Sequence, residues 1–162
     1  MLGSALFLLV APGVVAGLVP WLLTSWQAAP VPAVARVIGW ILIAAGGAAL
    51  VSAFARFALD GRGTPAPVAP TERLVVTGLY RFVRNPMYLA VAALIVGQAL
   101  VLARPVLWVY AAVFLVTVVA FVRLYEEPTL TATYGDEYAA YRRGVRGWWP
   151  RFRPWTAAEP RG

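Results

Sequence analysis

The sequence predicts an all-α integral membrane protein with four transmembrane helices. Apolar residues make up 61% of the chain and charged residues only 13%, whereas a soluble domain is about 45–50% apolar and about 25% charged. The mean hydropathy of +0.73 agrees with this composition. A chain of 162 residues is too small to hide so many apolar side chains in one core, because small domains bury only part of their surface. Insertion into a bilayer resolves this excess.

Four long segments without a charged residue carry the apolar content. They cover residues 2–26, 37–55, 87–103 and 106–122. At 1.5 Å per residue, 17 helical residues span roughly 25 Å, which suffices when the ends of the span snorkel to the interface. Because only Ala103, Arg104 and Pro105 connect the last two segments, we expect a tight antiparallel hairpin.

We expect a single membrane domain over residues 1–162, with a cytoplasmic loop at 60–86 between transmembrane helices in 1–59 and the hairpin at 87–122. A cytoplasmic C-terminal segment covers 123–162. Most arginines lie in the 60–86 loop region and the C-terminal segment, whereas the other two loops hold only Arg36 and Arg104. The positive-inside rule therefore predicts a cell or inner membrane protein with both termini in the cytoplasm.

Two further features concern packing and connection. Gly13 and Gly17 have small-xxx-small spacing, as do Ala45 and Ala49, which predicts close packing of the first two spans. The alternative is that Ala and Gly are simply abundant. Residues 61–70 are rich in Pro and Gly and are expected to form a connector without regular structure.

The chain has no Cys, no His and no Lys. Their absence excludes disulfides, thiol catalysis, Ser-His-Asp triads, His/Cys metal sites and Schiff-base lysines, so no metal site is predicted. The net charge of +7 would suggest nucleic acid for a soluble protein. Next to four membrane spans, anionic lipid headgroups are the expected partners instead.

The first polar cluster precedes the third span and extends over residues 77–88. Pro86 suits the first turn of a helix and Asn85 suits its N-cap. Arg84 and Tyr88 then lie four residues apart at a helix N-terminus, whose free N–H groups favour a carboxylate or phosphate. The alternative is a capped helix whose Arg and Tyr only anchor it at the interface.

The second polar cluster leaves the fourth span. Arg123 and Glu127 are spaced to pair on one helix face, and the acidic pair at 126–127 is costly at a membrane boundary unless it is paired or used. Pro128 invites a kink. Gly135 is expected to end this helix, and Asp136 to cap a second one.

Aromatic residues continue this cluster toward the C-terminus. Tyr134, Tyr138 and Tyr141 recur on one helix face, which is more typical of a packing surface than of a cofactor platform. Trp and Arg alternate in the tail at 147–155, as in single-stranded nucleic-acid binders. Beside four membrane spans, an interfacial anchor is the favoured interpretation.

Taken together, the two clusters resemble the isoprenylcysteine carboxyl methyltransferase family, which is itself similar to the membrane phospholipid N-methyltransferases. The similar residues cover about 71–154 and flank the hairpin; the first two spans carry no comparable motif. The ordered pattern is Gly78-x-Tyr80-x-x-x-Arg84-Asn85-Pro86-x-Tyr88, then Glu126-Glu127-x-x-Leu130-x4-Gly135-x-x-Tyr138-x-x-Tyr141.

The resemblance implies a cytosol-facing pocket for S-adenosylmethionine and a lipophilic acceptor that enters from the bilayer. It implies that one group of residues holds the cofactor: Tyr80, Arg84, Asn85, Pro86, Tyr88, Glu127, Tyr138 and Tyr141. Arg84, Arg123 and Glu127 are the implied catalytic residues, with the Arg123–Glu127 pair bordering the acceptor site.

One departure from the family concerns Asn85, which stands where its eukaryotic members typically have His. Asn does not titrate near neutral pH, so a role as an imidazole base is excluded. Methyl transfer does not require that base, because the sulfonium donor is already activated and a carboxylate or thiolate acceptor has no proton to lose. Positioning alone supplies roughly 7–11 kcal/mol in ideal cases.

The sequence thus favours a membrane methyltransferase that uses S-adenosylmethionine. Its acceptor is an isoprenylcysteine-type carboxylate or another small lipid-like molecule. If the acceptor is an amine, Glu127 gains importance as the group that removes a proton. The alternative is a non-catalytic membrane scaffold or lipid-binding protein that keeps the same fold.

Overall fold

A computed structural model describes residues 10–60 and 74–156, and within these ranges the regular structure is entirely helical. The connector predicted at 61–70 lies outside the described residues. The elements are a π-helical turn at Val14–Leu18, α2 at Val19–Thr24, α3 at Ala33–Asp60, a 3₁₀ turn at Gly78–Arg81, α4 at Pro86–Leu102, α5 at Pro105–Phe121, a π-helical turn at Val122–Glu126 and α6 at Glu127–Gly144.

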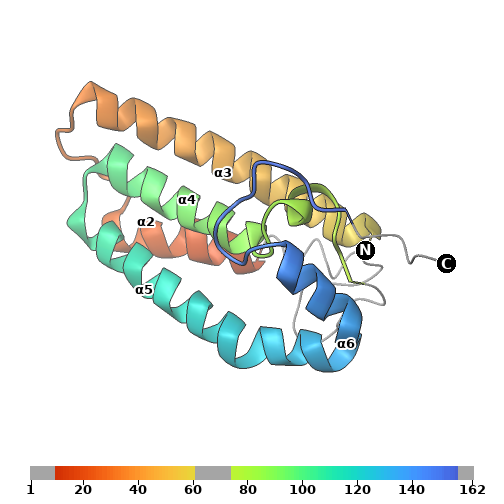
Figure 1. Cartoon of the computed structure of the whole chain (residues 1–162). Helices are drawn as coiled ribbons and strands as arrows, with labels where there is room; N and C mark the ends of the chain where they lie inside the picture. The colour runs from red at the N-terminus through yellow and green to blue at the C-terminus, as the bar shows by residue number, and fades with distance from the viewer. Residues whose placement is uncertain (1–9, 61–73, 157–162) are drawn as a thin grey trace.

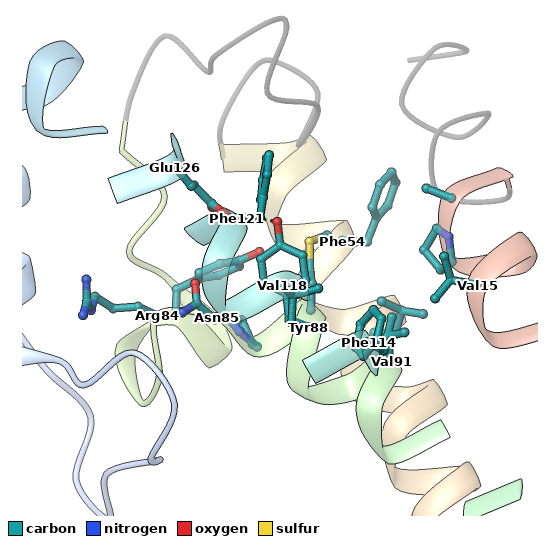
Figure 2. A pocket seen from close by; sticks show the side chains of 16 residues that line it. Val15, Phe54, Arg84, Asn85, Tyr88, Val91, Phe114, Val118, Phe121 and Glu126 are labelled. Carbon is teal, nitrogen blue, oxygen red and sulfur yellow. Dashed lines mark hydrogen bonds between the residues drawn. The ribbon is translucent and has the colours of Figure 1, made fainter. Parts of the chain in front are cut away.

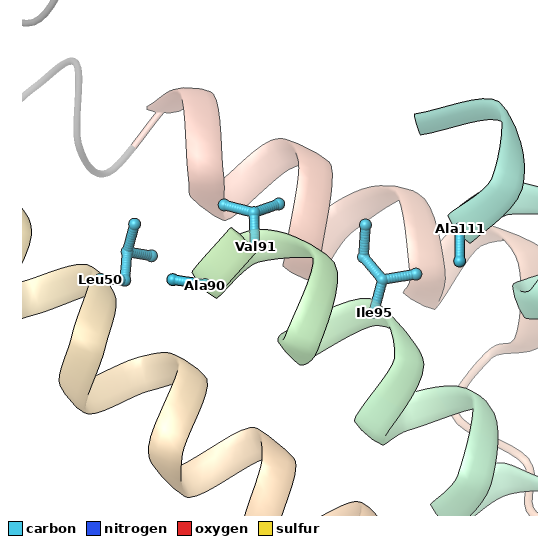
Figure 3. Packing of buried hydrophobic residues seen from close by; sticks show 5 residues of the cluster. All are labelled: Leu50, Ala90, Val91, Ile95 and Ala111. Carbon is cyan, nitrogen blue, oxygen red and sulfur yellow. The ribbon is translucent and has the colours of Figure 1, made fainter. Parts of the chain in front are cut away.

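The long helices form a bundle in which α3 lies beside α4, and α5 runs back along the other side (Figure 1). Leu50 of α3, Ile95 of α4 and Ala111 of α5 are buried in one shared core cluster (Figure 3). The connection between α2 and α3 and the connection between α4 and α5 lie at the same end of the bundle. There the backbone N–H of Ala29 donates to the carbonyl oxygen of Leu102 at 2.9 Å. The opposite end, where α4 starts and α5 leads into α6, is left free for polar residues.

The predicted apolar segments coincide with these helices wherever the structure describes them. Two helical stretches are long and apolar enough to cross a membrane, namely Ala33–Arg56 and Pro105–Gly144. Val10–Thr24 and Pro86–Leu102 are apolar but shorter. The predicted hairpin is confirmed: Ala103 adopts a left-handed conformation, Arg104 is extended, and Pro105 begins α5.

The predicted glycine packing of the first two spans is wrong. Outside its own helix and its chain neighbours, no described atom lies within 4 Å of a Cβ built on Gly13 or Gly17. The close contact joins α3 to α4 instead, because a Cβ on Gly39 would lie 2.7 Å from the carbonyl oxygen of Gly97, and the reverse contact is equally short. The first helix is held by side chains of the hairpin: Tyr110 donates to the carbonyl oxygen of Val15 at 2.7 Å.

Two irregularities turn the chain after α5. The π-helical turn at Val122–Glu126 inserts an additional residue into the helix, as such bulges do. Gly135, with φ 50° and ψ −122°, then breaks α6 at the predicted position. As a result α6 bends back toward the start of α4 (Figure 1). This bend brings the two polar clusters of the sequence together.

Candidate functional site

The site begins at the N-terminus of α4. Asn85 occupies the N-cap position and Pro86 follows in the first turn, as predicted. The expected side-chain cap is absent, however, because Asn85 makes no cap hydrogen bond. Its Nδ2 is buried without a hydrogen-bond partner among the described residues, and so is Nε of Arg84. Two neighbouring donors therefore remain available inside the protein.

The central contact of the site is an ion pair between α4's entry segment and α6. Nη1 of Arg84 lies 2.7 Å from Oε1 of Glu127 and also donates to the hydroxyl of Tyr138 at 2.9 Å. Nη2 of the more exposed Arg142 lies 3.3 Å from Oε2 of Glu127. Both carboxylate oxygens of Glu127 therefore face a guanidinium group.

The predicted pair between Arg123 and Glu127 is wrong. Arg123 is exposed, and in the described part of the chain neither ion pair of Glu127 involves it. The physical reason is the π-helical turn at Val122–Glu126, because the wider turn removes the i, i+4 alignment on which the prediction depended. Arg123 also lines neither of the two cavities at the site.

Glu126 faces a different direction from Glu127. The hydroxyl of Tyr88 donates to Oε2 of Glu126 at 3.0 Å. Among the described residues, no ion pair involves Glu126. Burial raises the pKa of the Glu126 carboxyl, and the neighbouring Glu127 raises it further, while the Tyr88 hydrogen bond and Arg84 oppose the shift. Glu126 is thus a partly buried acid that forms no ion pair in the described part of the chain, although the charge of Arg84 acts on it.

Tyrosines surround this polar centre. Tyr80, Tyr138 and Tyr141 are each at least 93% buried, and the hydroxyl of Tyr141 donates to the carbonyl oxygen of Tyr80 at 2.6 Å. Burial raises the pKa of Tyr80 and of Tyr141, so both stay neutral at physiological pH. Tyr138 and Tyr141 also pack with Val145 in a core cluster. Tyr134, Tyr138 and Tyr141 therefore pack against the core, as predicted, and also line the smaller cavity of the site.

Two adjoining cavities meet at these residues. The larger one has a volume of about 440 Å³ and is walled mainly by apolar side chains, among them Phe54, Phe114 and Phe121. Figure 2 shows Glu126 and Tyr88 among its lining, with Arg84 and Asn85 toward one end and Val15, Val91 and Phe114 toward the other.

The smaller cavity, of about 70 Å³, is lined by a set that includes Glu127 and four tyrosines. Both cavities share a boundary of four residues, namely Tyr80, Arg84, Asn85 and Glu126. The two neighbouring glutamates are therefore divided: Glu126 lines both cavities, whereas Glu127 lines only the smaller one.

The C-terminal tail forms part of the site's support. The backbone N–H groups of Arg84 and Asn85 donate to the carbonyl oxygens of Arg146 and Gly147 at 3.0 and 3.2 Å. A Cβ on Gly147 would lie 3.2 Å from Nη2 of Arg84, so a side chain there would press on the site. Phe152 of the tail is fully exposed, and the interfacial anchor expected there stays a prediction.

The structure gathers every sequence-predicted site residue except Arg123. Sequence reasoning missed the separate position of Glu126 and the close approach of Gly147. The acidic pair was visible in the sequence, but only the π-helical turn decides which carboxylate faces which cavity. For Gly147 the signal was a glycine next to two tryptophans, which does not by itself indicate a backbone contact.

Comparison with known proteins identifies a family. A model of the phospholipid methyltransferase family matches residues 34–137, about two thirds of the chain. The match begins in α3, so it includes the second apolar segment, which the motif resemblance did not cover; it ends just before Tyr138. No curated protein and no solved structure matches the chain. The resemblance to membrane methyltransferases is thereby confirmed at the level of this family, without the isoprenylcysteine subgroup.

Replacing Glu126 with Gln should stabilise the fold relative to the wild type at high pH. The pKa of Glu126 is raised above its ordinary 4.5 in the folded protein. The wild type therefore loses stability as the pH rises from 4.5 through the raised pKa. The free energy of unfolding falls by about 1.4 kcal/mol for each unit by which folding raises the pKa. Gln has no such dependence. Thermal unfolding midpoints in detergent at pH 4, 6 and 8 should diverge in favour of Glu126→Gln, whereas the exposed Glu137→Gln control should follow the wild type. Parallel curves for all three proteins would contradict the burial argument.

Proposed function

The chain belongs to the phospholipid methyltransferase family, and on this premise we propose that it is an integral-membrane methyltransferase that uses S-adenosylmethionine and acts on a lipophilic acceptor. The observation that carries the proposal is the pair of adjoining cavities that share Arg84 and Asn85. One cavity is small and lined by tyrosines and acidic residues, and the other is large and apolar. The smaller cavity, of about 70 Å³, has room for the amino-acid end of a polar donor rather than for the whole molecule, and an apolar acceptor in the larger cavity would meet that donor at the shared boundary.

The residues present fit S-adenosylmethionine. Its amino-acid portion carries a carboxylate. Nε of Arg84 and Nδ2 of Asn85 are buried donors that have no partner among the described residues, and such groups bind a carboxylate. Leaving such donors unpaired costs about 1–3 kcal/mol each, so a ligand that accepts from them gains affinity. Tyr80, Tyr138 and Glu127 would border the cofactor on the side of the smaller cavity.

The cofactor supplies an activated methyl group, and the protein supplies position. Arg84 is held by Glu127 and Tyr138 in one orientation, which reduces the freedom that binding would otherwise have to remove. Asn85 remains uncharged across the physiological range, so it orients a ligand without moving a proton. Because Arg123 lies outside both cavities, we assign it no role at the acceptor.

The acceptor belongs in the larger cavity. Its walls come from the first helix and from α3, α4 and α5, with side chains such as Leu50, Val91 and Val118. Burying an alkyl chain among these residues stabilises the complex by about 25 cal/mol for each Å² of apolar surface. An isoprenylcysteine-type carboxylate and other small lipid-like acceptors both meet this apolar requirement.

Calorimetric titration of the purified protein with S-adenosylhomocysteine tests the cofactor assignment. We expect binding by the wild type and at least about 10-fold weaker binding by Glu127→Gln, because loss of its charge releases Arg84 from its orientation; hydrogen bonds to charged groups contribute about 1.5–3 kcal/mol. Glu137→Gln on the exposed side of α6 is the matched control. A folded wild type that does not bind at millimolar ligand would instead favour a non-catalytic scaffold or lipid-binding protein.

We further propose that both termini and the site face the cytoplasm, which the distribution of arginines supports. The chain has no cysteine, so a thiol reagent can label only a cysteine that is introduced by substitution, and its labelling reports on which side of the membrane that position lies. A cysteine at Thr156 should resist a membrane-impermeant maleimide in intact cells, and one at Gln27 should react. The opposite labelling pattern would reverse the orientation.

A further inference from the structure

The first helix, Val10–Thr24, forms part of the wall of the larger cavity. Ala11, Pro12 and Val15 contribute to the lining, and Val15 lies toward the end away from the polar residues (Figure 2). The family match begins at residue 34, so this helix lies outside the matched region. The cavity is therefore completed by an element that the family comparison does not include.

Pro20 leaves two carbonyl oxygens of this helix without their usual donor. Proline has no backbone N–H, whereas an N–H at position 20 would donate to Ala16 at α-helical spacing or to Val15 at π-helical spacing. The N–H of Val19, which is the α-helical donor to Val15, donates to the carbonyl oxygen of Val14 instead. Because Pro20 is buried, it creates two neighbouring acceptors in the apolar interior of the protein.

Two polar side chains of the hairpin reach these acceptors. Nε2 of Gln98 in α4 donates to the carbonyl oxygen of Ala16 at 2.8 Å. The hydroxyl of Tyr110 in α5 donates to the carbonyl oxygen of Val15 at 2.7 Å. A backbone group without a partner is costly within a bilayer, so these two bonds hold the first helix against α4 and α5. Val15 and Ala16 also pack against the core cluster of the bundle.

We propose that Gln98 and Tyr110 are positioning residues, which dock the first helix as a wall of the larger cavity by supplying the donors that Pro20 cannot provide. The inference rests on the proposed function only where it assigns an apolar ligand to that cavity. Close glycine packing does not hold this helix, because Gly13 and Gly17 make no such contact with the described part of the other helices. Removing either donor therefore loosens the helix and opens the wall.

Backbone hydrogen exchange of residues 10–24 in phosphatidylcholine nanodiscs tests the docking. Tyr110→Phe and Gln98→Met each remove one donor and keep a side chain of similar size. We expect exchange to become about 3- to 15-fold faster in each variant, the range that single interhelical hydrogen bonds in membranes give. Thr117→Val is the matched control and should exchange like the wild type, because the Thr117 hydroxyl donates to Val113 of its own helix.

Pro20→Ala separates a hydrogen-bond role from simple packing. Alanine restores the N–H of position 20, so the first helix can satisfy its own carbonyl oxygens. In the Pro20→Ala background, Tyr110→Phe should accelerate exchange by less than about twofold, because two substitutions that act on one interaction do not add. An equal acceleration in both backgrounds would refute the proposal. Exchange that neither Tyr110→Phe nor Gln98→Met changes would also refute it.

Equilibrium dialysis of radiolabelled 1-dodecanol against nanodiscs with and without the protein tests the wall. We expect the variant that combines Gln98→Met with Tyr110→Phe to bind this neutral probe about tenfold more weakly, or by about 1.4 kcal/mol, because the first helix no longer covers the alkyl chain. Its affinity for S-adenosylhomocysteine should stay unchanged, since Arg84, Asn85 and Glu127 are intact. A general loss of structure would instead lower both affinities.

The outcomes separate this inference from the function beneath it. If the wild type and the combined variant bind dodecanol equally well, the wall role is refuted and the methyltransferase assignment stands. If the wild type binds S-adenosylhomocysteine but not dodecanol, the assignment of an apolar ligand to the larger cavity fails, and the wall role fails with it. If the wild type does not bind S-adenosylhomocysteine, the proposed function itself fails, while the exchange measurements still decide how the first helix is docked.

Discussion

The ion pair between Arg84 and Glu127 is the interaction on which the rest of the site depends. It joins residues 43 positions apart, and the two side chains are only 13% and 14% exposed. Removing such charges from water costs several kcal/mol for each ion unless further hydrogen bonds compensate them. Tyr138 and Arg142 supply those contacts. The start of α4 and the first turn of α6 are thereby held together at the polar end of the bundle.

This constraint organises the surrounding elements. With Arg84 fixed, its backbone N–H and that of Asn85 donate two hydrogen bonds to carbonyl oxygens of the C-terminal tail. The π-helical turn places Glu127 on the side of the pair and leaves Glu126 at the apolar cavity. Of these two adjacent acids, Glu127 lines only the smaller cavity, whereas Glu126 lines both.

Much of the fold follows from local sequence rules, while the site depends on features that these rules do not include. Apolar segments, Asn85 before Pro86 and the break at Gly135 were predictable because each depends on hydropathy or local backbone preference. The Arg123–Glu127 pair was not, because a π-helical turn changes which side chains share a face. The packing of Gly39 on Gly97 depends on which helices become neighbours, and no local pattern encodes that choice.

The most direct measurement of the central claim is an experimental structure of the protein with S-adenosylhomocysteine bound. We predict that the ligand's carboxylate accepts hydrogen bonds from Nε of Arg84 and Nδ2 of Asn85, the two buried donors without a partner among the described residues, while Arg84 keeps its pair with Glu127. A ligand bound elsewhere, with both donors left as they are, would contradict this claim. So would a ligand that enters the site only after the Arg84–Glu127 pair has separated.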